Sequence, residues 1–232
     1  MDQDTTQALF SAFIVVATML LVGFPVHEAL HAWTAMKLGD NTARWMGRVT
    51  LDPRAHFDQM GALILGVTAV FSAIGPGGIL FGWAKPTPVN PTNLRNGRQG
   101  HALVAFAGPA SNLVVAVLAA IPFRVLWANP EWWNATVTNP LGELLLDALW
   151  LLLSLNILLF IFNLLPIPPL DGWSVLKGIV PRSAARQMTE LEIRYASVLP
   201  MVFFGFVIII FLTGGSFLGA FISSVRSILV GF

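Results

Sequence analysis

The sequence predicts an all-α polytopic membrane protein. Hydrophobic residues make up 56% of its 232 residues and charged residues only 11%, which is less than half of the ~25% found in an ordinary soluble domain. The charged residues also leave five uncharged stretches of roughly 20 residues or more, and each of them is long enough to cross a bilayer. This composition excludes a soluble globular protein, a disordered chain and a nucleic-acid binder with a basic face.

The uncharged stretches define the expected membrane segments. They are residues 5–26, 59–84, 102–123, 148–170 and 195–225. The second stretch contains the helix-breaking sequence GPGG at 75–78 and is followed by three prolines, so we expect it to be irregular. In the last stretch, residues 197–213 make one span before Gly214 and Gly215 interrupt it, and 217–231 is short for another crossing. The sequence therefore predicts one or two C-terminal membrane helices.

The basic residues favour one topology. Residues 37–58, 85–100 and 171–195 contain four, three and four of the thirteen Lys and Arg, whereas residues 124–142 contain one. If 59–84 enters and leaves on the same side, eleven of the thirteen lie on that side, which is what the positive-inside rule favours. We therefore expect a multi-pass protein of the cell (plasma or inner) membrane, with its N-terminus outside. Its core is expected to have three transmembrane helices and a re-entrant membrane segment between the first and the second.

The sequence HEALH at residues 27–31 is the sharpest chemical signal. Two histidines at positions i and i+4 share one helix face, and a metal ion can bind between them. Glu28 lies beside the first histidine, where a carboxylate can take a proton from a metal-activated water. Because the motif continues an apolar run, its titratable side chains are costly to bury in a membrane and are by default functional.

A third metal ligand is needed, because catalytic zinc usually has three protein ligands and a water. The chain has no cysteine, so that ligand is His, Asp or Glu. His56 and His101 lie in loops or at a segment edge and fit polar interface residues better. Asp171 ends the run NLLPIPPLDG, whose prolines impose a rigid, non-helical stretch that is tolerated at membrane depth only under cover. The re-entrant topology places Asp171 on the same side as the HEALH motif. The set of two histidines and a carboxylate suits one zinc ion per chain and also suits Fe(II); the HExxH context favours zinc.

Two asparagines are further candidates, because an amide in an apolar helix needs a partner. Asn163, at the start of NLLPIPPLDG, either donates to a substrate carbonyl or its oxyanion, or makes a helix–helix hydrogen bond; the sequence favours neither. Asn112, in AGPASN, is a candidate for substrate contact, but the small residues around it favour a role in helix packing.

Together these motifs resemble the site-2 protease family of intramembrane zinc metalloproteases, peptidase family M50. The resemblance is carried by HEALH, AGPASN and NLLPIPPLDG, and by GRVTLDP and FGWAKPTPVNP between the first two. It covers most of residues 10–180. It is closest to the short prokaryotic branch, which is built around the membrane core without a PDZ or CBS domain.

The resemblance implies a role for each matching residue. His27, His31 and Asp171 would bind zinc, Glu28 would act as catalytic base and then as acid, and Asn163 would steady the substrate carbonyl. Between the first two core helices the family has a re-entrant β-hairpin that pairs with an extended substrate. The residues that fall there, which we expect to bind substrate, are Gly82, Trp83, Ala84 and Lys85.

The expected function is hydrolysis of a peptide bond within or near a transmembrane segment of a membrane-protein substrate, as in regulated intramembrane proteolysis. The partners would be that substrate and the lipid bilayer, with no nucleic acid; the oligomeric state stays open. One integral membrane domain would cover 1–232, with the catalytic core at about 8–180, membrane segments at about 195–232, and the active site toward the cytoplasm.

Two alternatives remain. One is a non-catalytic zinc-binding or ion-transporting membrane protein, although the only other carboxylates near a span, Glu143 and Asp147, lie at its outer end. The other is a protease-like scaffold that does not cut, which the intact Glu28 argues against.

Overall fold

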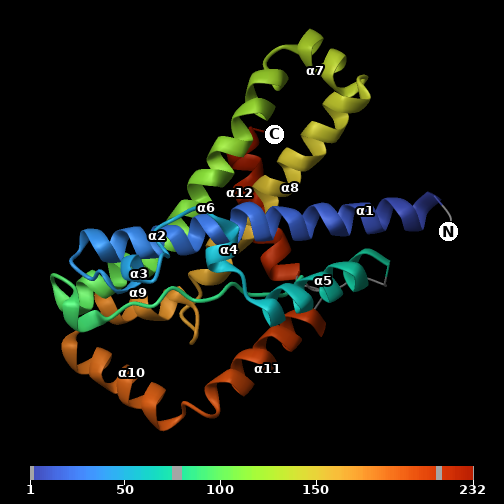
Figure 1. Cartoon of the computed structure of the whole chain (residues 1–232). Coiled ribbons are helices and arrows are strands. Elements are labelled where there is room, and N and C mark those ends of the chain that lie inside the picture. Colours follow the sequence, from blue (N-terminus) through green and yellow to red (C-terminus); the bar gives the residue numbers. More distant parts are fainter. Residues whose placement is uncertain (1–2, 75–79, 213–215, 232) are drawn as a thin grey trace.

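The computed structural model describes residues 3–74, 80–212 and 216–231, and the described residues form helices joined by loops, with no β-strand among them (Figure 1). Three helices are long and apolar enough to cross a membrane: Thr5–Lys37, Gly97–Trp127 and Pro140–Asn163. The prediction of an all-α polytopic membrane protein is confirmed. The GPGG sequence at 75–78 and the pair Gly214 and Gly215 lie outside the described residues.

The first long helix is continuous but not regular. It consists of α1 (Gln3–Thr18), a π-helical turn η1 (Met19–Gly23) and α2 (Phe24–Lys37). Such π-turns are rare and are found mostly near functional sites. Here the turn ends two residues before Pro25, which has no amide hydrogen to continue the helical ladder, and one helical turn before His27.

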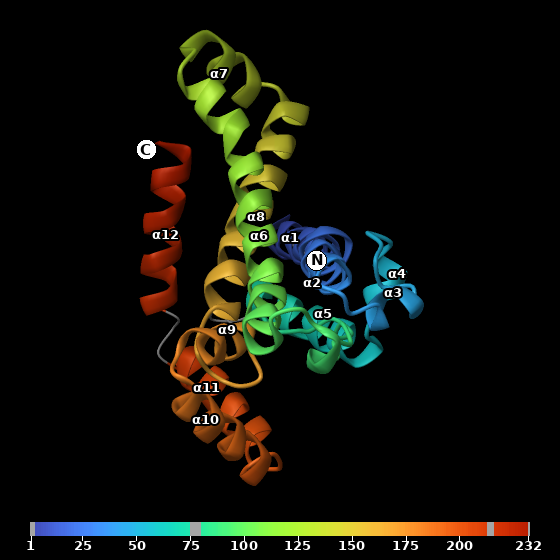
Figure 2. The same cartoon turned by 90° about the vertical axis from the view of Figure 1, so that its left-hand side faces the viewer.

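The second and third long helices form an antiparallel pair. They are α6 (Gly97–Trp127) and α8 (Pro140–Asn163), joined at their far end by the short α7 (Pro130–Val137). Buried Ala116, Ala120, Leu153 and Ile157 form part of the core between them. The α1–α2 helix crosses this pair steeply, as Figures 1 and 2 both show, and it contacts α6 through α2.

The segment between the first two core helices turns back on itself. Helix α5 (Gln59–Ile74) packs along α1, and residues 80–90 return beside α5 in an extended conformation. The amide of Lys85 donates to the carbonyl oxygen of His56 over 2.9 Å, so the segment begins and ends at the same point. The segment therefore folds back on itself, and its re-entry into a membrane stays a prediction. A helix and an unpaired extended stretch stand where the family resemblance suggested a β-hairpin.

Two glycines explain how closely the extended stretch approaches α5. A Cβ on Gly61 would lie 2.0 Å from the carbonyl oxygen of Trp83, and a Cβ on Gly82 would lie 2.5 Å from the Cβ of Leu65. The hydroxyl of Thr68 also donates to the carbonyl oxygen of Phe81 over 2.9 Å. This packing covers one face of the extended stretch with α5.

The remaining helices surround one end of the core. Short α3 (Thr42–Trp45) and α4 (Pro53–His56) follow α2, and α9 (Asp171–Ile179), α10 (Arg182–Arg194) and α11 (Leu199–Leu212) follow α8. The chain bends by 96° between α10 and α11. The last helix, α12 (Ser216–Val230), stands beside α6 and α8 (Figure 2).

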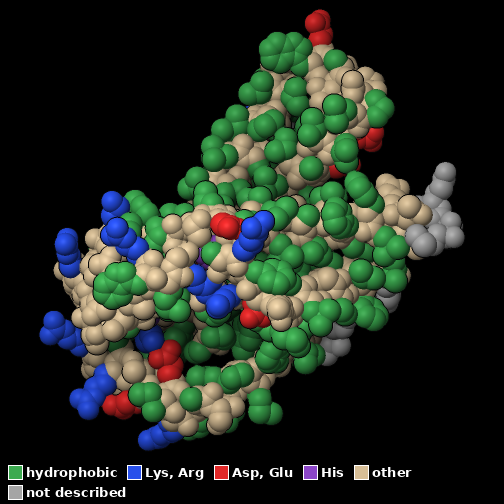
Figure 3. Space-filling model, in the orientation of Figure 1, with side chains coloured by type: hydrophobic (Ala, Val, Ile, Leu, Met, Phe, Trp, Pro, Cys, Tyr) green, Lys and Arg blue, Asp and Glu red, His purple; other side chains and the backbone are tan. Residues whose placement is uncertain are grey.

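The surface is divided between apolar and basic regions. Figure 3 shows hydrophobic side chains over most of the visible face, while most of the visible Lys and Arg side chains gather on the side where α2 ends and α9 and α10 lie. Large apolar side chains such as Leu103, Phe106 and Leu118 of α6 are between 43% and 59% exposed. Such exposure is expected when lipid rather than water surrounds the helix.

Candidate metal centre and active site

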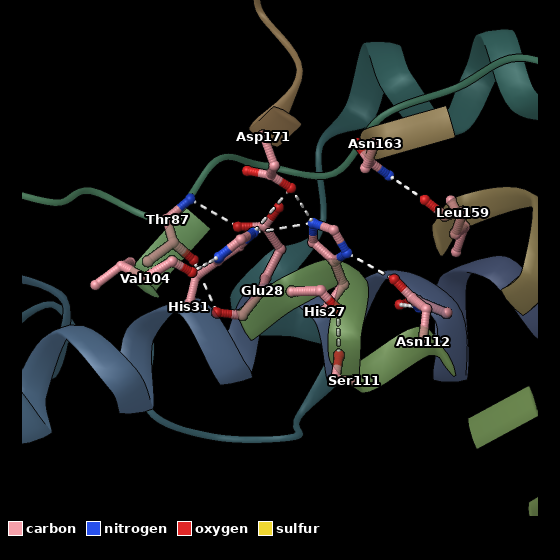
Figure 4. A network of polar contacts seen from close by, with 12 residues as sticks. His27, Glu28, His31, Thr87, Val104, Ser111, Asn112, Leu159, Asn163 and Asp171 are labelled. Atoms are coloured by element: carbon pink, nitrogen blue, oxygen red, sulfur yellow. Dashed lines mark hydrogen bonds and ion pairs between the residues drawn. The ribbon is translucent and has the colours of Figure 1, made fainter. Parts of the chain in front are cut away.

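Two imidazole rings of α2 lie side by side, one helical turn apart. His27 and His31 are each only 7% exposed, and their Nε2 atoms are 2.9 Å apart (Figure 4). The HEALH spacing therefore has the predicted effect: both rings face the same interior space.

The carboxylate of Asp171 completes the cluster. Its Oδ2 lies 3.1 Å from Nε2 of His27 and 3.4 Å from Nε2 of His31. Asp171 is the first residue of α9 and lies two residues after the last proline of NLLPIPPLDG. Burial opposes its ionisation, but the neighbouring His31 and His27 hold the pKa of the Asp171 carboxyl well below its usual range. It is therefore a carboxylate at neutral pH.

The donor atoms fit a zinc ion. Nδ1 of His31 faces the carbonyl oxygen of Val104 at 2.7 Å, and Nδ1 of His27 faces Oδ1 of Asn112 at 2.7 Å. Both partners are acceptors, so each Nδ1 carries the proton and each Nε2 presents a lone pair. When both imidazoles are neutral, as metal binding requires, two Nε2 lone pairs and a carboxylate oxygen converge, which is the donor set of a catalytic zinc site.

The distances agree with this assignment. A tetrahedral ion with bonds of ~2.0–2.1 Å holds its ligand atoms roughly 3.3 Å apart, and the three observed separations run from 2.9 to 3.4 Å. Among the described residues, these three side chains form the one group of three or more possible ligands close enough to share a metal ion.

The rings of His27 and His31 pack against a glycine. Gly108 of α6 lies so close to the rings that a Cβ there would be 2.3 Å from Nε2 of His31 and 2.7 Å from Nε2 of His27. Real Cβ atoms do not approach other atoms so closely. AGPASN therefore contributes a surface without a side chain, against which the two rings pack.

Glu28 is held by the extended segment. The backbone amide of Thr87 donates to Oε2 of Glu28 over 2.7 Å (Figure 4). The Thr87 hydroxyl donates to the backbone carbonyl oxygen of Glu28 over 3.0 Å. Thr87 was not among the residues expected to bind substrate, although its segment was.

The two asparagines differ in position. Asn112 is completely buried, and its amide contacts His27, Gly23 and Asn156; its contact with substrate stays a prediction. Asn163 lies near the cluster in Figure 4, and its Nδ2 donates to the carbonyl oxygen of Leu159, one turn earlier in the same helix, over 2.9 Å. Its proposed action on substrate stays a prediction.

The remaining candidate residues do not belong to the cluster of His27, His31 and Asp171. Gly82, Trp83, Ala84 and Lys85 belong to the extended stretch that leads to Thr87. His56 is the last residue of α4 and is buried. Its Nε2 faces the carbonyl oxygen of Thr50 at 2.8 Å. His101 lies in the first turns of α6, outside the three-ligand group.

Sequence reasoning missed three residues that hold the site: Gly108, Thr87 and Asn156. Gly108 and Thr87 stand inside motifs that were identified, AGPASN and FGWAKPTPVNP, so closer attention to those motifs could have found them. Asn156 is an isolated amide in the apolar helix α8, and that alone was a signal, because a buried amide requires a partner.

Comparison with known proteins agrees with this geometry. A sequence profile of peptidase family M50 matches residues 14–212. The chain is 36% identical over 173 residues to the "Putative zinc metalloprotease YwhC" of Bacillus subtilis. The aligned residues cover 75% of this chain and 72% of that protein. The chain is 31% identical over 207 residues to the "Putative zinc metalloprotease Rip2" of Mycobacterium tuberculosis, covering 87% and 71% of the two chains. No solved structure matches the chain significantly.

Proposed function

Because this chain belongs to peptidase family M50, the site-2 protease family of zinc metalloproteases, we propose that it is an intramembrane endopeptidase. It would hydrolyse a peptide bond within or near a transmembrane segment of another membrane protein, as in regulated intramembrane proteolysis. The observation that carries this proposal is the convergence of His27, His31 and Asp171 beside Glu28, inside a protein whose long helices are apolar enough to span a bilayer.

His27, His31 and Asp171 would hold the zinc ion. Bound there, zinc supplies Lewis acidity, which makes water a stronger acid and a peptide carbonyl a better electrophile. Glu28, the neighbour of His27 in the sequence, takes one proton from the attacking water as the new C–O bond forms. It then gives that proton to the leaving amine as the C–N bond breaks, so no net proton is consumed.

The extended segment would hold the substrate. A transmembrane helix satisfies its own peptide groups, so it must unwind before water can attack it. Among the described residues, no backbone hydrogen bond joins Gly82, Trp83 or Ala84 to another segment. Their free backbone groups support pairing with an unwound substrate strand, which would replace part of the hydrogen bonding that the substrate helix loses.

The charge distribution supports an orientation. Loops 37–58, 85–100 and 171–195 carry most of the basic residues, and the amide of Lys85 meets His56 at the base of the α5 segment. The three loops can therefore share one side, and we assign that side to the cytoplasm. Water would then reach the site from the cytoplasm, and the N-terminus would lie outside.

The proposal is tested with the full chain, purified in detergent, and a synthetic single-span peptide whose apolar segment contains Asn and Pro. We expect cleavage inside the apolar segment, loss of cleavage after chelation and its return with Zn²⁺.

Glu28→Gln should reduce the rate by at least ~100-fold, since general acid–base catalysis contributes ~10²–10⁴. Glu190→Gln, on the exposed face of α10, is the matched control. Cleavage by Glu28→Gln at the unmodified protein's rate would refute the mechanism. Cleavage of unstructured casein alone would refute the intramembrane substrate.

A further inference from the structure

A line of three buried polar side chains joins α8, α6 and α2. Asn156 and Asn112 are fully buried, and His27 is 7% exposed. Nδ2 of Asn112 donates to Oδ1 of Asn156 over 2.9 Å, and Oδ1 of Asn112 meets Nδ1 of His27 at 2.7 Å (Figure 4 shows the Asn112–His27 contact). Burying amides in an apolar bundle costs free energy unless each is hydrogen-bonded. Each amide of this line is paired, and the line ends at the imidazole of His27.

Backbone carbonyls fix the direction of every hydrogen bond in the line. Nδ2 of Asn156 donates to the carbonyl oxygen of Leu152 over 2.8 Å, which leaves Oδ1 of Asn156 to accept. Nδ2 of Asn112 donates its second hydrogen to the carbonyl oxygen of Gly23 over 3.2 Å. A carbonyl cannot donate, so neither amide can turn over without setting two oxygens against each other.

We propose that Asn156 is a positioning residue that acts through Asn112 to hold His27 in its metal-binding tautomer. With both hydrogens of Asn112 committed, only its oxygen faces His27, so the proton stays on Nδ1 and the lone pair of Nε2 points at the metal position. The inference rests on the proposed role of His27 as a zinc ligand. Partners of this kind typically change metal affinity 10- to 100-fold.

The two histidines differ in this respect. Nδ1 of His31 faces a backbone carbonyl, that of Val104, and no substitution of a side chain removes that acceptor. His27 depends on two side chains from two other helices. Substitutions at Asn156 should therefore loosen one ligand while leaving the other in place.

The test measures zinc affinity of the metal-free full chain in detergent, by competition with a chelator, together with the visible absorption spectrum of the Co²⁺ form. Asn156→Leu removes the acceptor and should weaken zinc binding 10- to 100-fold and alter the cobalt spectrum. Asn156→Thr should restore most of the affinity, because a threonine hydroxyl can donate to the carbonyl four residues earlier and still accept from Asn112. Leu153→Ala, a fully buried neighbour outside the line, should lower the melting temperature without changing zinc affinity.

The outcomes separate the inference from the proposed function. If the unmodified chain binds zinc, His27→Ala abolishes binding, and Asn156→Leu binds as tightly as the unmodified chain, the positioning role is wrong while the metal site stands. If His27→Ala does not change zinc binding, the proposed metal site itself fails. Should Asn156→Leu not fold, Asn156→Ala removes the same acceptor without added bulk, and unchanged zinc affinity in that variant overturns the inference equally.

Discussion

The amide of Thr87 donates a hydrogen bond to Oε2 of Glu28 over 2.7 Å, which ties the extended segment to the helix that carries both histidines. Prolines stand on both sides of Thr87, and neither has an amide hydrogen. Thr87 is thus the one residue of the sequence Pro86–Thr87–Pro88 whose backbone can reach the carboxylate as a donor. The segment expected to bind substrate and the residue expected to move protons are therefore coupled by a single amide.

Replacing Thr87 by proline removes that amide hydrogen and keeps an extended backbone. A hydrogen bond to a charged group is worth ~1.5–3 kcal/mol, so we expect cleavage to slow by roughly 10- to 100-fold, with zinc content unchanged. Thr87→Val, the control, loses only the hydroxyl bond to the Glu28 carbonyl oxygen and should slow the reaction by no more than a few-fold. Initial rates on the single-span peptide compare the two, and equal rates would show that the amide has no role.

Adding one methyl group at Gly108 should empty the metal site. The Cβ of Gly108→Ala would lie 2.3 Å from Nε2 of His31, so the rings must move, and overpacking of this kind costs ~1–3 kcal/mol. Metal analysis should find zinc strongly reduced. In Gly66→Ala, where nothing lies within 4 Å of the new Cβ, zinc content should persist and stability should hold or rise by up to ~1 kcal/mol. A Gly108→Ala protein with full zinc content would contradict the packing described.

Arg48 should control how firmly the extended segment is held. This buried guanidinium donates to the carbonyl oxygens of Ala55, Lys85 and Pro86. Arg48→Lys keeps the charge but loses the planar fork of donors. We expect the amide hydrogen of Lys85, the next backbone donor in this segment, to exchange about 10- to 100-fold faster, corresponding to ~1–3 kcal/mol of lost local stability.

Hydrogen–deuterium exchange followed by mass spectrometry reports on peptides that contain Lys85. The exposed Arg54 is the control, since Arg54→Lys alters a surface side chain and should leave stability within ~0.5 kcal/mol. Indistinguishable exchange in the two variants would show that Arg48 does not clamp the segment.

Asp40 should make stability depend on pH. It is buried, which by itself would raise the pKa of its carboxyl, but hydrogen bonds from Thr42, Asn90 and Asn93 outweigh burial and lower that pKa. A depressed folded-state pKa contributes stability above the unfolded value of ~3.9, and this contribution is lost as the pH falls through the folded value.

The melting temperature of the unmodified chain should therefore fall more steeply than that of Asp40→Asn as the pH drops from ~5 to ~3. At neutral pH Asp40→Asn should be the less stable protein, by ~1–3 kcal/mol, because its amide group meets the Asn90 amide donor. Thermal unfolding in detergent at several pH values gives both curves. Parallel curves would mean that another carboxylate is responsible for the acid sensitivity.

The proximity of the three candidate metal ligands could be predicted from the sequence. Helical periodicity placed His27 and His31 on one face, and the charge distribution favoured a re-entrant segment between the first two core helices. The same topology put Asp171 beside them, and the structure has the three side chains within 4.8 Å of one another. These features follow from rules that act along the chain or across a bilayer, which is why a single sequence reveals them.

The supporting contacts could not be predicted in the same way. Whether Asn112 faced substrate or a ligand depended on which side of α6 met α2, and that is decided by packing among three helices. Likewise the stretch around residues 82–85, where the family resemblance suggested a β-hairpin, is an extended segment without a strand partner among the described residues, and α5 beside it packs along α1. The glycines Gly61 and Gly82 allow the following stretch to lie flat against it.

The ligands of the metal centre are unevenly distributed along the chain. His27 and His31 are made early, in α2, whereas Asp171 opens α9, after the long helices α6 and α8. During synthesis, a nascent chain that ends before Asp171 contains Glu28 and both imidazoles but not the third candidate ligand. The order of synthesis thus delays the assembly of the three-residue cluster until α6 and α8 have been made.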